Sequence, residues 1–453
     1  MTVAQVADVS PKYLVEAAGN AVPLGCKQTE VGVIPEDWDT PKFGEMCTLI
    51  NGRGFKPHEW SIEGLPIIRI QNLNGSEEFN HYQGHYDPKI FVQNGQLLFA
   101  WSGSRGTSFG PHIWHGGNAL LNYHTWKLVI RDQNIDADYF FHILKQLTKQ
   151  IEESAHGASA LVHTQKGEME NFFVPLPKRR QEQTAIANAL SDVDALISKL
   201  EKLIAKKQAI KTATMQQLLT GRTRLPQFTL RENGTKKGTK PSELGEIPED
   251  WDAIKMGNLA KIQRGASPRP IDSPIWFERN STVGWLRISD ASKTHKYLME
   301  TTQSLSELGI ANSRFVPENN LVMSICATVG KPIITKKDLC IHDGFVVFNG
   351  LSVNQDYMYY ILKELEDEWS KQGQTGSQMN LNTDLINGTY VAIPQIDEEQ
   401  ITIATILSEM DEEIQALEQR LGKTRQIKQG MMQELLTGKT RLVQPRNKEC
   451  QHG

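Results

Sequence analysis

The sequence predicts an α+β protein in which two homologous globular domains are each followed by a long helix. Three observations lead to this fold class. First, the chain repeats itself in order, at an offset that stays between 213 and 218 residues. Second, all nine tryptophans and many short apolar runs bounded by turn residues lie in two stretches, residues 30–177 and 243–394. Third, residues 181–220 contain neither Pro nor Gly, and residues 398–437 contain only two glycines.

The repeated segments indicate two collinear halves, because they keep Trp, Pro, Tyr and Arg at matched places. The matched pairs are TEVGVIPEDWD at 29–39 with SELGEIPEDWD at 242–252, DYFFHILKQL at 138–147 with DYMYYILKEL at 356–365, EQTAIANALS at 182–191 with EQITIATILS at 399–408, and QQLLTGRTRL at 216–225 with QELLTGKTRL at 433–442. A low-complexity coincidence is thereby excluded.

The repeats also set the predicted domain boundaries. In chain order we expect an N-terminal segment (1–27), a first globular domain (28–177), a central helical spacer (178–225), a linker (226–241), a second globular domain (242–394), a distal helical spacer (395–442) and a C-terminal tail (443–453). Each globular domain should hold a helix, near 138–150 and 356–370. The linker is polar and basic, so it is expected to be exposed and mobile.

The two long helical segments carry matched apolar residues at steps of three and four, which predicts a helix–helix seam. The predicted seam consists of Leu190, Val193, Ile197, Leu200 and Ile204 in the first helix and Leu407, Met410, Ile414, Leu417 and Leu421 in the second. The first helix alone widens its stripe with Ala189, Leu196, Leu203 and Ile210. Gly422 and Gly430 replace Ala205 and Ala213 in the second, so a kink or local softness is expected there.

Duplication invites a symmetry argument. If a pseudo-two-fold axis relates the globes, the helices that follow them must run antiparallel, as in an antiparallel coiled coil. A forty-residue helix spans roughly 60 Å. Proteins that read B-DNA place two modules ~34 Å or a multiple apart, so this length suits DNA. A duplicated, non-catalytic protein-interaction scaffold fits the same geometry, and both interpretations stay open at this point.

The order of motifs resembles the specificity subunit of type I restriction-modification enzymes. IPEDW opens each globe, IP or LP closes it, EQ starts each helix, and LLTG[RK]TRL ends it. The resemblance implies two target recognition domains that read a bipartite, asymmetric double-stranded DNA site. It also implies helices that set the spacer and dock two methyltransferase subunits, with restriction (motor) subunits joining this core. S-adenosylmethionine, ATP and Mg would then belong to the partners, with no cofactor in this chain.

Catalysis by the chain itself is not expected. Residues 438–440, GKT, resemble the end of a phosphate-binding loop, but Gln433 stands where that motif needs Gly, and the segment follows a helix. No dinucleotide fingerprint follows a strand, and no histidine pair has a metal-ligand spacing backed by carboxylates. No run of 18 apolar residues and no secretory leader is seen, so a cytoplasmic protein is expected, without membrane association. A DNA-modifying enzyme is therefore disfavoured.

Candidate DNA contacts are the positions where the scaffold matches and the loops differ. Arg and Lys suit phosphate or guanine, Gln and Asn suit adenine, and Ser and Asp suit other base edges. The predicted contacts are Arg53, Lys56, Arg69, Gln71, Asn72, Ser104 and Arg105 in the first globe, and Arg264, Arg269, Arg287, Ser289, Asp290, Gln378 and Asn380 in the second. For Arg69 and Arg287, an internal anchor is as well supported as a DNA contact.

The net charge of the whole chain is −4, so any site for a polyanion must be confined to one region. The two long helical segments differ in charge. Residues 178–225 hold ten Lys and Arg against four Asp and Glu, whereas residues 398–442 hold six against eight. This asymmetry favours pairing of the two helices, and lysines of the first could also line spacer DNA.

Overall fold

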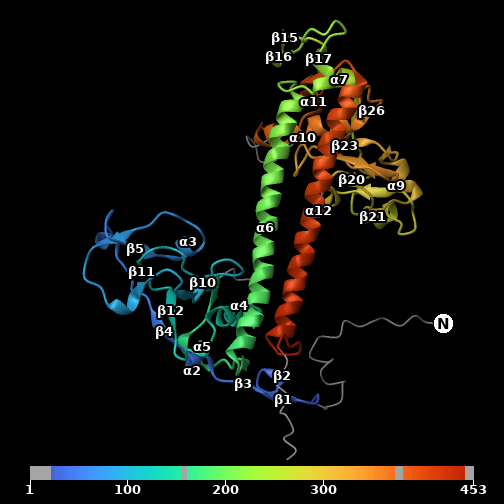
Figure 1. Cartoon of the computed structure of the whole chain (residues 1–453). Helices are drawn as coiled ribbons and strands as arrows, with labels where there is room; N and C mark the ends of the chain where they lie inside the picture. The colour runs from blue at the N-terminus through green and yellow to red at the C-terminus, as the bar shows by residue number, and fades with distance from the viewer. Residues whose placement is uncertain (1–21, 155–160, 373–380, 444–453) are drawn as a thin grey trace, which may run out of the picture. The chain divides into compact units, whose positions relative to one another are not determined.

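The computed structural model describes residues 22–154, 161–372 and 381–443 (Figure 1). The chain divides into two compact units, unit 1 (Met1–Lys199 with Leu421–Gly453) and unit 2 (Leu200–Arg420). Each unit therefore contains one globe and a part of each long helix. The units cut across the predicted helical spacers, because each globe packs on the helix segments beside it.

Unit 1 contains two four-stranded sheets. The first has the order β10 (Gly110–Ile113), β8 (Leu97–Ala100), β12 (Thr125–Ile130), β4 (Cys47–Asn51), and the second has the order β6 (His81–Tyr82), β5 (Leu65–Ile68), β11 (Ala119–Leu121), β7 (Phe91–Val92). Two-stranded pairs join β1 (Cys26–Thr29) to β2 (Gly32–Pro35), β9 (Ser102–Ser104) to β13 (Leu161–His163), and β3 (Trp38–Asp39) to β14 (Leu176–Pro177). The helices of this globe are α2 (Phe43–Met46), α3 (Ile70–Leu73), α4 (Ala137–Ser154) and α5 (Lys166–Asn171).

Unit 2 repeats this plan. Its sheets have the orders β18 (Lys261–Arg264), β26 (Phe345–Asn349), β23 (Leu321–Ser324), β24 (Pro332–Thr335), β20 (Tyr297–Leu298), and β21 (Gln303–Ser304), β19 (Gly284–Leu286), β25 (Leu339–Ile341), β22 (Arg314–Val316). Further pairs are β15 (Thr239–Ser242) with β16 (Gly245–Pro248) and β17 (Trp251–Lys255) with β27 (Tyr390–Pro394), and the helices are α7 (Met256–Leu259), α8 (Ile288–Lys293), α9 (Glu307–Ala311), α10 (Gln355–Gln372) and α11 (Thr383–Gly388). The α+β class and the helices predicted within each globe are confirmed.

The two long helices are α6 (Arg180–Leu219) and α12 (Asp397–Leu435). They run antiparallel in both units, because rising numbers in α6 meet falling numbers in α12. In unit 1, Lys428 Nζ lies 2.6 Å from Asp194 Oδ1. In unit 2, Lys207 Nζ lies 2.7 Å from Glu413 Oε1, and Lys211 pairs with Asp411. α12 continues through both of its glycines without a break, and the kink or local softness expected there stays a prediction.

Burial follows the predicted apolar stripe. Five predicted seam residues are buried and five are half-buried; the buried ones are Leu190, Leu200, Ile204, Leu407 and Ile414. Leu190 and Leu407 belong to the main cores of their globes. The extra residues of α6 are different, because Leu196, Leu203 and Ile210 are 36 to 41% exposed. The repeated stripe is therefore used inside each unit, while the extra stripe faces outward.

One arginine closes unit 1 by joining three distant motifs, in an arrangement that we call the first clasp. Arg441, after the end of α12, binds Asp37 through two bonds of 2.9 Å and also binds Glu182 at the start of α6. The guanidinium lies 5.8 Å from the Trp38 ring centroid. Glu182 is only 1% exposed. The repeated IPEDW, EQ and TR motifs thus meet at one charged joint.

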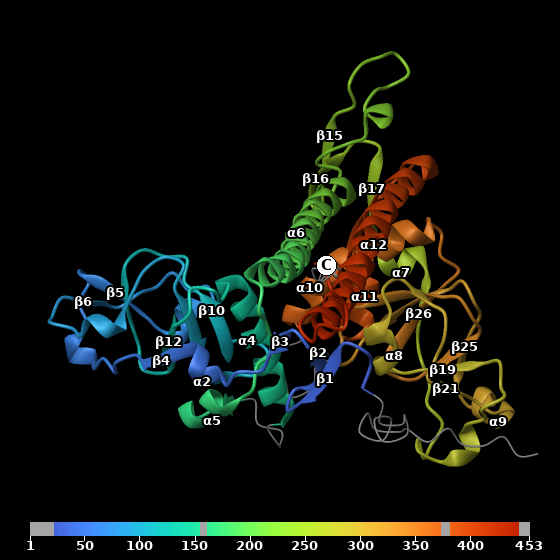
Figure 2. The same cartoon turned by 60° about the horizontal axis from the view of Figure 1, so that its bottom comes forward.

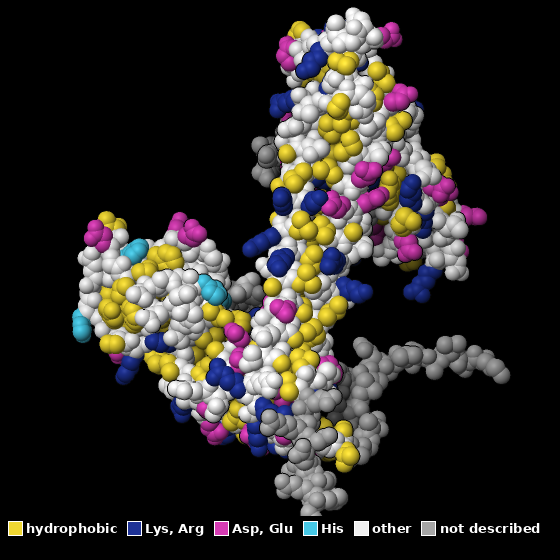
Figure 3. All heavy atoms as spheres, viewed as in Figure 1, with side chains coloured by type: hydrophobic (Ala, Val, Ile, Leu, Met, Phe, Trp, Pro, Cys, Tyr) yellow, Lys and Arg dark blue, Asp and Glu magenta, His cyan; other side chains and the backbone are white. Residues whose placement is uncertain are grey.

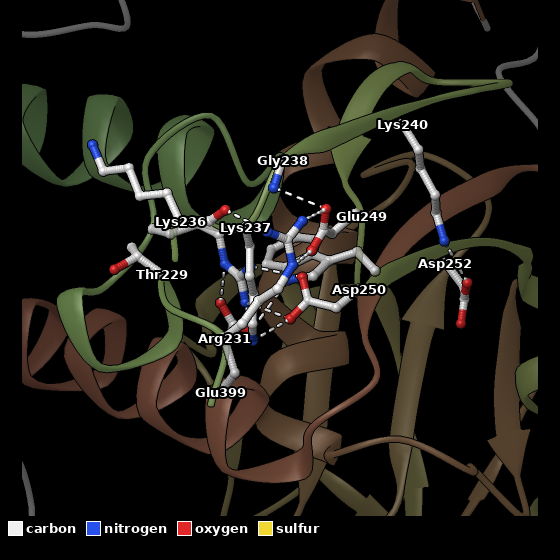
Figure 4. Close-up of polar contacts among 12 residues, drawn as sticks. Thr229, Arg231, Lys236, Lys237, Gly238, Lys240, Glu249, Asp250, Asp252 and Glu399 are labelled. Atoms are coloured by element: carbon white, nitrogen blue, oxygen red, sulfur yellow. Dashed lines mark hydrogen bonds and ion pairs between the residues drawn. The ribbon is translucent and has the colours of Figure 1, made fainter. Parts of the chain in front are cut away.

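The second clasp closes unit 2 with the equivalent residues (Figure 4). Arg224, after the end of α6, binds Asp250 at 2.6 and 3.1 Å and Glu399 of α12 at 2.9 and 2.5 Å. The Trp251 indole N–H donates to Glu399 at 3.2 Å. Both clasps follow a glycine with positive φ, Gly221 (67°) and Gly438 (71°), a conformation typical of the end of a helix.

The linker of residues 226–241 is largely exposed, as expected, and ion pairs tie it to unit 2, while its mobility stays a prediction. Arg231 binds both carboxylate oxygens of Glu249, at 2.9 and 2.6 Å, and Lys237 binds Asp250 at 2.7 Å (Figure 4). The linker then enters the β15–β16 hairpin (Figure 2). Its positive charge, which suggested exposure, pairs with acidic residues around the second clasp.

Candidate nucleic-acid interface

A pair of parallel strands builds a cavity in unit 1. Strands β5 and β11 pair with Ile67 opposite Leu120, so both chains leave the sheet at the same edge. Residues 69–71 follow β5 and residues 122–125 follow β11; we call these two segments the first edge. Arg69, Ile70, Gln71 and residues 122–125 line a cavity of about 300 Å³ there. Two loops that are distant in sequence thus form one concave surface.

The same topology builds the second edge, residues 287–289 and 341–343 of unit 2. Strands β19 and β25 are parallel, with Leu286 opposite Ile341. The backbone N–H of Ala266 donates to Ile341 O at 3.1 Å. In unit 1, the backbone N–H of Arg53 donates to Leu121 O in the same way, at 2.9 Å. A third segment therefore joins each edge: the one that follows β4 in unit 1 and the one that follows β18 in unit 2.

The second edge carries a carboxylate where the first has an aromatic ring. Asp343 is the second residue after β25, as Tyr123 is the second residue after β11. Its oxygens accept from Ser267 Oγ at 3.0 Å and lie 3.3 Å from Arg269 Nη2. Burial raises the pKa of Asp343, but the Ser267 hydrogen bond, His342 and the nearby arginines lower it overall. Asp343 is therefore ionised at neutral pH and holds the basic groups of this edge.

Several predicted contacts lie on or beside the edges. Arg69 and Gln71 line the first cavity, and Arg287 and Ser289 occupy the equivalent places in the second edge. Arg69 is also an anchor: its Nη1 donates to Asn80 Oδ1 at 2.9 Å, and its guanidinium lies 5.4 Å from the Trp60 ring centroid. Both roles left open for Arg69 are compatible with this placement.

The predicted phosphate contacts differ in how far their side chains are paired and how far they are exposed. Arg53 pairs with Glu59 and lies 4.9 Å from the Phe55 ring centroid. Arg264 donates from Nε to Asp343 O at 2.6 Å. The side chains of Lys56 and Arg269 project to solvent; that of Arg269 is 71% exposed.

The structure does not favour the base-reading roles predicted for Asn72 and Asp290. Asn72 is 8% and Asp290 9% exposed, and both cap the short helix that begins each edge. Asn72 Oδ1 accepts from the Arg69 backbone N–H at 3.0 Å, and Asp290 Oδ2 accepts from the Arg287 backbone N–H at 3.2 Å. Asp290 also accepts from Thr302. A side chain consumed by such caps has no free group to offer a base.

The remaining predicted contacts lie away from the cavity or outside the description. Ser104 ends β9, and its backbone N–H donates to Ser108 Oγ at 2.7 Å. Arg105 is exposed in the following turn, whose Gly106 N–H donates to Glu152 of α4 at 2.7 Å. Gln378 and Asn380 lie outside the described residues.

The sequence prediction missed four residues of the edges, namely Tyr123, His124, His342 and Asp343. The Tyr123 and His124 rings lie 3.7 Å apart between centroids, and the Trp101 indole N–H donates to Tyr123 O at 3.1 Å. The repeats give no signal for them, because His124 and His342 share the offset of 218 but are not equivalent in the fold: the Trp101 N–H donates to His124 O as the Ile325 N–H donates to Gly344 O. Figure 3 shows further histidines on the exposed face of unit 1.

Within residues 22–154, 161–372 and 381–443, no three His, Cys, Asp or Glu side chains are grouped to bind a metal ion. In the same ranges, no helix combines the length and apolar character that a bilayer crossing requires.

A family model described as "Type I restriction modification DNA specificity domain" matches residues 35–212 and 248–429. The chain belongs to this family. The MjaVIII specificity subunit of Methanocaldococcus jannaschii is 25% identical to this specificity subunit over 90% of this chain and 94% of its own. The putative MjaX specificity subunit of that organism is 27% identical over 92% and 96%. The crystal structure of a type I S subunit from M. genitalium shares the fold, with a TM-score of 0.54, 14% identity and coverage of 88% and 96%.

Family membership decides between the interpretations that the sequence left open. This specificity subunit serves DNA sequence recognition in a type I restriction-modification system, in which specificity subunits work with methyltransferase and restriction subunits. The protein-interaction scaffold is not favoured. The edges of the two globes are then the natural candidates for contacts with DNA, because they differ between the halves while their scaffold is shared.

Proposed function

We propose that this specificity subunit reads a bipartite, asymmetric DNA site, with each globe contacting one half. The duplicated clasp carries the proposal. Arg441 and Arg224 tie the two globes, through equivalent carboxylates, to the start of one long helix and the end of the other. The two clasps are equivalent, whereas the two edges differ in their residues. This combination suits a protein in which two readers of different specificity are held in the same way.

We further propose that α6 and α12 form an antiparallel coiled coil about a pseudo-two-fold axis, and that its length sets the spacer between the half-sites. The buried stripe and the ion pairs between the helices support this. Two methyltransferase subunits would dock on the helices, and restriction subunits would join them. Methyl transfer and cleavage, with S-adenosylmethionine, ATP and Mg, would belong to those partners, so that this chain carries no catalysis.

Sequencing the methylated bases of a strain that carries the intact system tests the bipartite site. The expected result is two short specified clusters, unlike each other and separated by unspecified base pairs. A single continuous cluster would contradict the proposal. DNA binding by the full-length chain that ignores both sequence and salt would contradict it as well.

A matched insertion tests the spacer. Seven residues inserted after Leu203 in α6 and after Glu418 in α12 lengthen both helices within unit 2, near the Lys207–Glu413 pair. At ~1.5 Å per residue the helices gain roughly 10 Å, which equals about three base pairs at ~3.4 Å each. The methylated clusters should move apart by that amount while their sequences stay the same. An unchanged separation would show that the helices do not set it.

A further inference from the structure

The first edge differs from the second in having an uncommitted histidine. His342 is engaged by its own chain: its Nδ1 accepts from the Gly344 N–H at 2.9 Å and lies 3.6 Å from Asp343 Oδ1. His124 of the first edge corresponds to Gly344 of the second, since their backbone carbonyls accept from the matched residues Trp101 and Ile325. Its Nδ1 is buried and has no hydrogen-bond partner among the residues that the structure describes. A buried polar atom without a partner is uncommon in a folded protein and points to a missing ligand or water.

The groups around His124 suit a base better than a phosphate. The cavity of about 300 Å³ is lined by the neutral groups of Gln71, Asn122, Tyr123 and Thr125 in addition to Arg69. The Arg69 guanidinium is already engaged by Asn80 and Trp60. Burial and the neighbouring His163 lower the pKa of His124, so the imidazole is neutral and offers one donor and one acceptor. A phosphate would instead be met by unpaired cations.

Two exposed side chains at the mouth of the cavity indicate which edges of a base pair it would contact. The Gln71 side chain is exposed, and among the described residues its amide makes one long contact of 3.5 Å, to Glu78 O. The Tyr123 ring is 47% exposed and rests on His124, while the Trp101 indole N–H fixes its backbone. A glutamine amide can bind adenine N6 and N7 together in the major groove, and an apolar surface beside it can contact the thymine methyl group.

We propose that the cavity of the first edge reads one A·T base pair of the DNA site, with Gln71 on the adenine edge, Tyr123 against the thymine methyl group, and His124 as the polar floor. The inference rests on the proposed function and adds to it the residues and the base pair. The second edge lacks this combination, because Ser289, Asp343 and Gly344 replace Gln71, Tyr123 and His124.

The test is selection of bound duplexes from a randomised library by the full-length chain, for the wild type and for Gln71→Ala, Tyr123→Ala and His124→Gln. Gln71 and Tyr123 are exposed, so their removal should leave the fold intact. We expect Gln71→Ala and Tyr123→Ala to relax preference at one A·T position, by roughly tenfold for Gln71→Ala, and to leave the other half-site unchanged. His124→Gln should relax the same position.

Two controls make the result specific. Tyr297→Ala removes a tyrosine of similar exposure, 44%, from a strand of unit 2 outside the edges, and should leave every position unchanged. Replacing the thymine of the identified pair by uracil removes only the methyl group. It should weaken wild-type binding by roughly fourfold, the value of one buried methyl, and should not weaken binding by Tyr123→Ala further.

The outcomes separate the inference from the function on which it rests. If the wild type selects a bipartite site and Gln71→Ala selects the same site with equal stringency, the inference is overturned and the proposed function stands. If relaxation occurs at a G·C pair or equally in both halves, the assignment is also overturned. If the wild type selects no sequence at all, the proposed function itself fails.

Discussion

Units 1 and 2 attach their globes to the long helices at equivalent positions but with different chemistry. In unit 1, His142 of α4 hydrogen-bonds Ser191 Oγ at 3.1 Å, and Lys145 binds Asp194 at 2.9 Å. In unit 2 the position of His142 is held by Tyr360, whose hydroxyl contacts Ser408 at 3.1 Å and Asp411 at 2.9 Å.

Unit 2 adds a buried lysine, which has no counterpart among the described residues of unit 1. Lys296 is 8% exposed, donates to Ser408 Oγ at 2.8 Å, and lies 4.8 to 5.2 Å from three tyrosine ring centroids. The aspartate–lysine pair between the two long helices is kept in both units, as Asp194–Lys428 and Asp411–Lys211. The pairing of the two helices was therefore retained after duplication, while the contacts of each globe with the helices diverged.

The largest expected effect comes from removing a clasp. Arg441→Ala and Arg224→Ala each leave a buried glutamate without its cation, so each should lower the free energy of unfolding of its unit by about 3–5 kcal/mol. Urea denaturation with hydrogen exchange resolved by unit measures this. Only Arg441→Ala should speed exchange at the end of its helix, around residues 430–443, because Arg231 and Lys237 hold the linker after Arg224 in unit 2.

The matched control for the clasps is Arg231→Ala. This arginine also binds a carboxylate through two bonds, but its side chain is 44% exposed. The loss should stay below about 1 kcal/mol. Equal losses for Arg231 and the clasp arginines would contradict the assignment of the clasps as buried joints.

Mild acid should destabilise unit 1 more than unit 2. Burial lowers the pKa of His142 to about 4, with Lys145 and Lys428 adding to the effect and Asp194 opposing it. The unfolded chain therefore binds a proton below about pH 6.5 that the folded chain refuses until about pH 4. Stability is present above this window and falls as the pH falls through it, by up to about 3 kcal/mol.

Unit 2 has a tyrosine at the position of His142, so its stability should change less between pH 7 and pH 5. Hydrogen exchange at the two pH values measures each unit in one sample. His142→Gln should remove the excess acid sensitivity of unit 1. Parallel acid responses of the two units in the wild type would disprove the role of His142.

Replacing the glycine before each clasp should lower the free energy of unfolding by an intermediate amount. A Cβ on Gly438 would lie 2.6 Å from Pro35 Cδ, and one on Gly221 would lie 2.5 Å from Pro248 Cδ. Together with the positive φ, this predicts that Gly438→Ala and Gly221→Ala each cost about 1–3 kcal/mol in thermal unfolding. Gly422→Ala is the control, because its Cβ meets open space in α12. It should stabilise the chain by about 0.5–1 kcal/mol; a loss there would point to a hidden contact.

The smallest effect on stability is expected at the exposed cations beside the edges. Lys56→Ala and Arg269→Ala should change the free energy of unfolding by less than about 0.5 kcal/mol. If each cation contacts a phosphate, DNA binding should weaken for all sequences alike, and the slope of log affinity against log salt should fall by about one unit. Titrations at several salt concentrations measure this. A change confined to one sequence would instead assign a base contact.

Sequence alone predicted the features that depend on local pattern. The period of the apolar residues predicted α6 and α12, and the constant offset of the repeats predicted two homologous α+β globes. Gly221 and Gly438, just beyond the ends of these helices, have the positive φ that glycine adopts without strain. The candidate contacts were predicted less well. Arg69 and Gln71 proved to line a cavity, whereas Asn72 and Asp290 proved to be internal caps, because the choice between capping and binding depends on neighbours that the sequence does not specify.

Tertiary structure decided which distant segments meet. Asp37 and Arg441 are 404 residues apart, and their motifs are visible in the sequence, yet only the folded chain brings them to 2.9 Å. The same holds for the first edge, where the parallel pairing of β5 with β11 places Gln71 beside His124. Local periodicity is visible in the sequence because helices and strands are built from neighbouring residues. Long-range pairing is not, because it depends on the sum of many weak contacts across the whole fold.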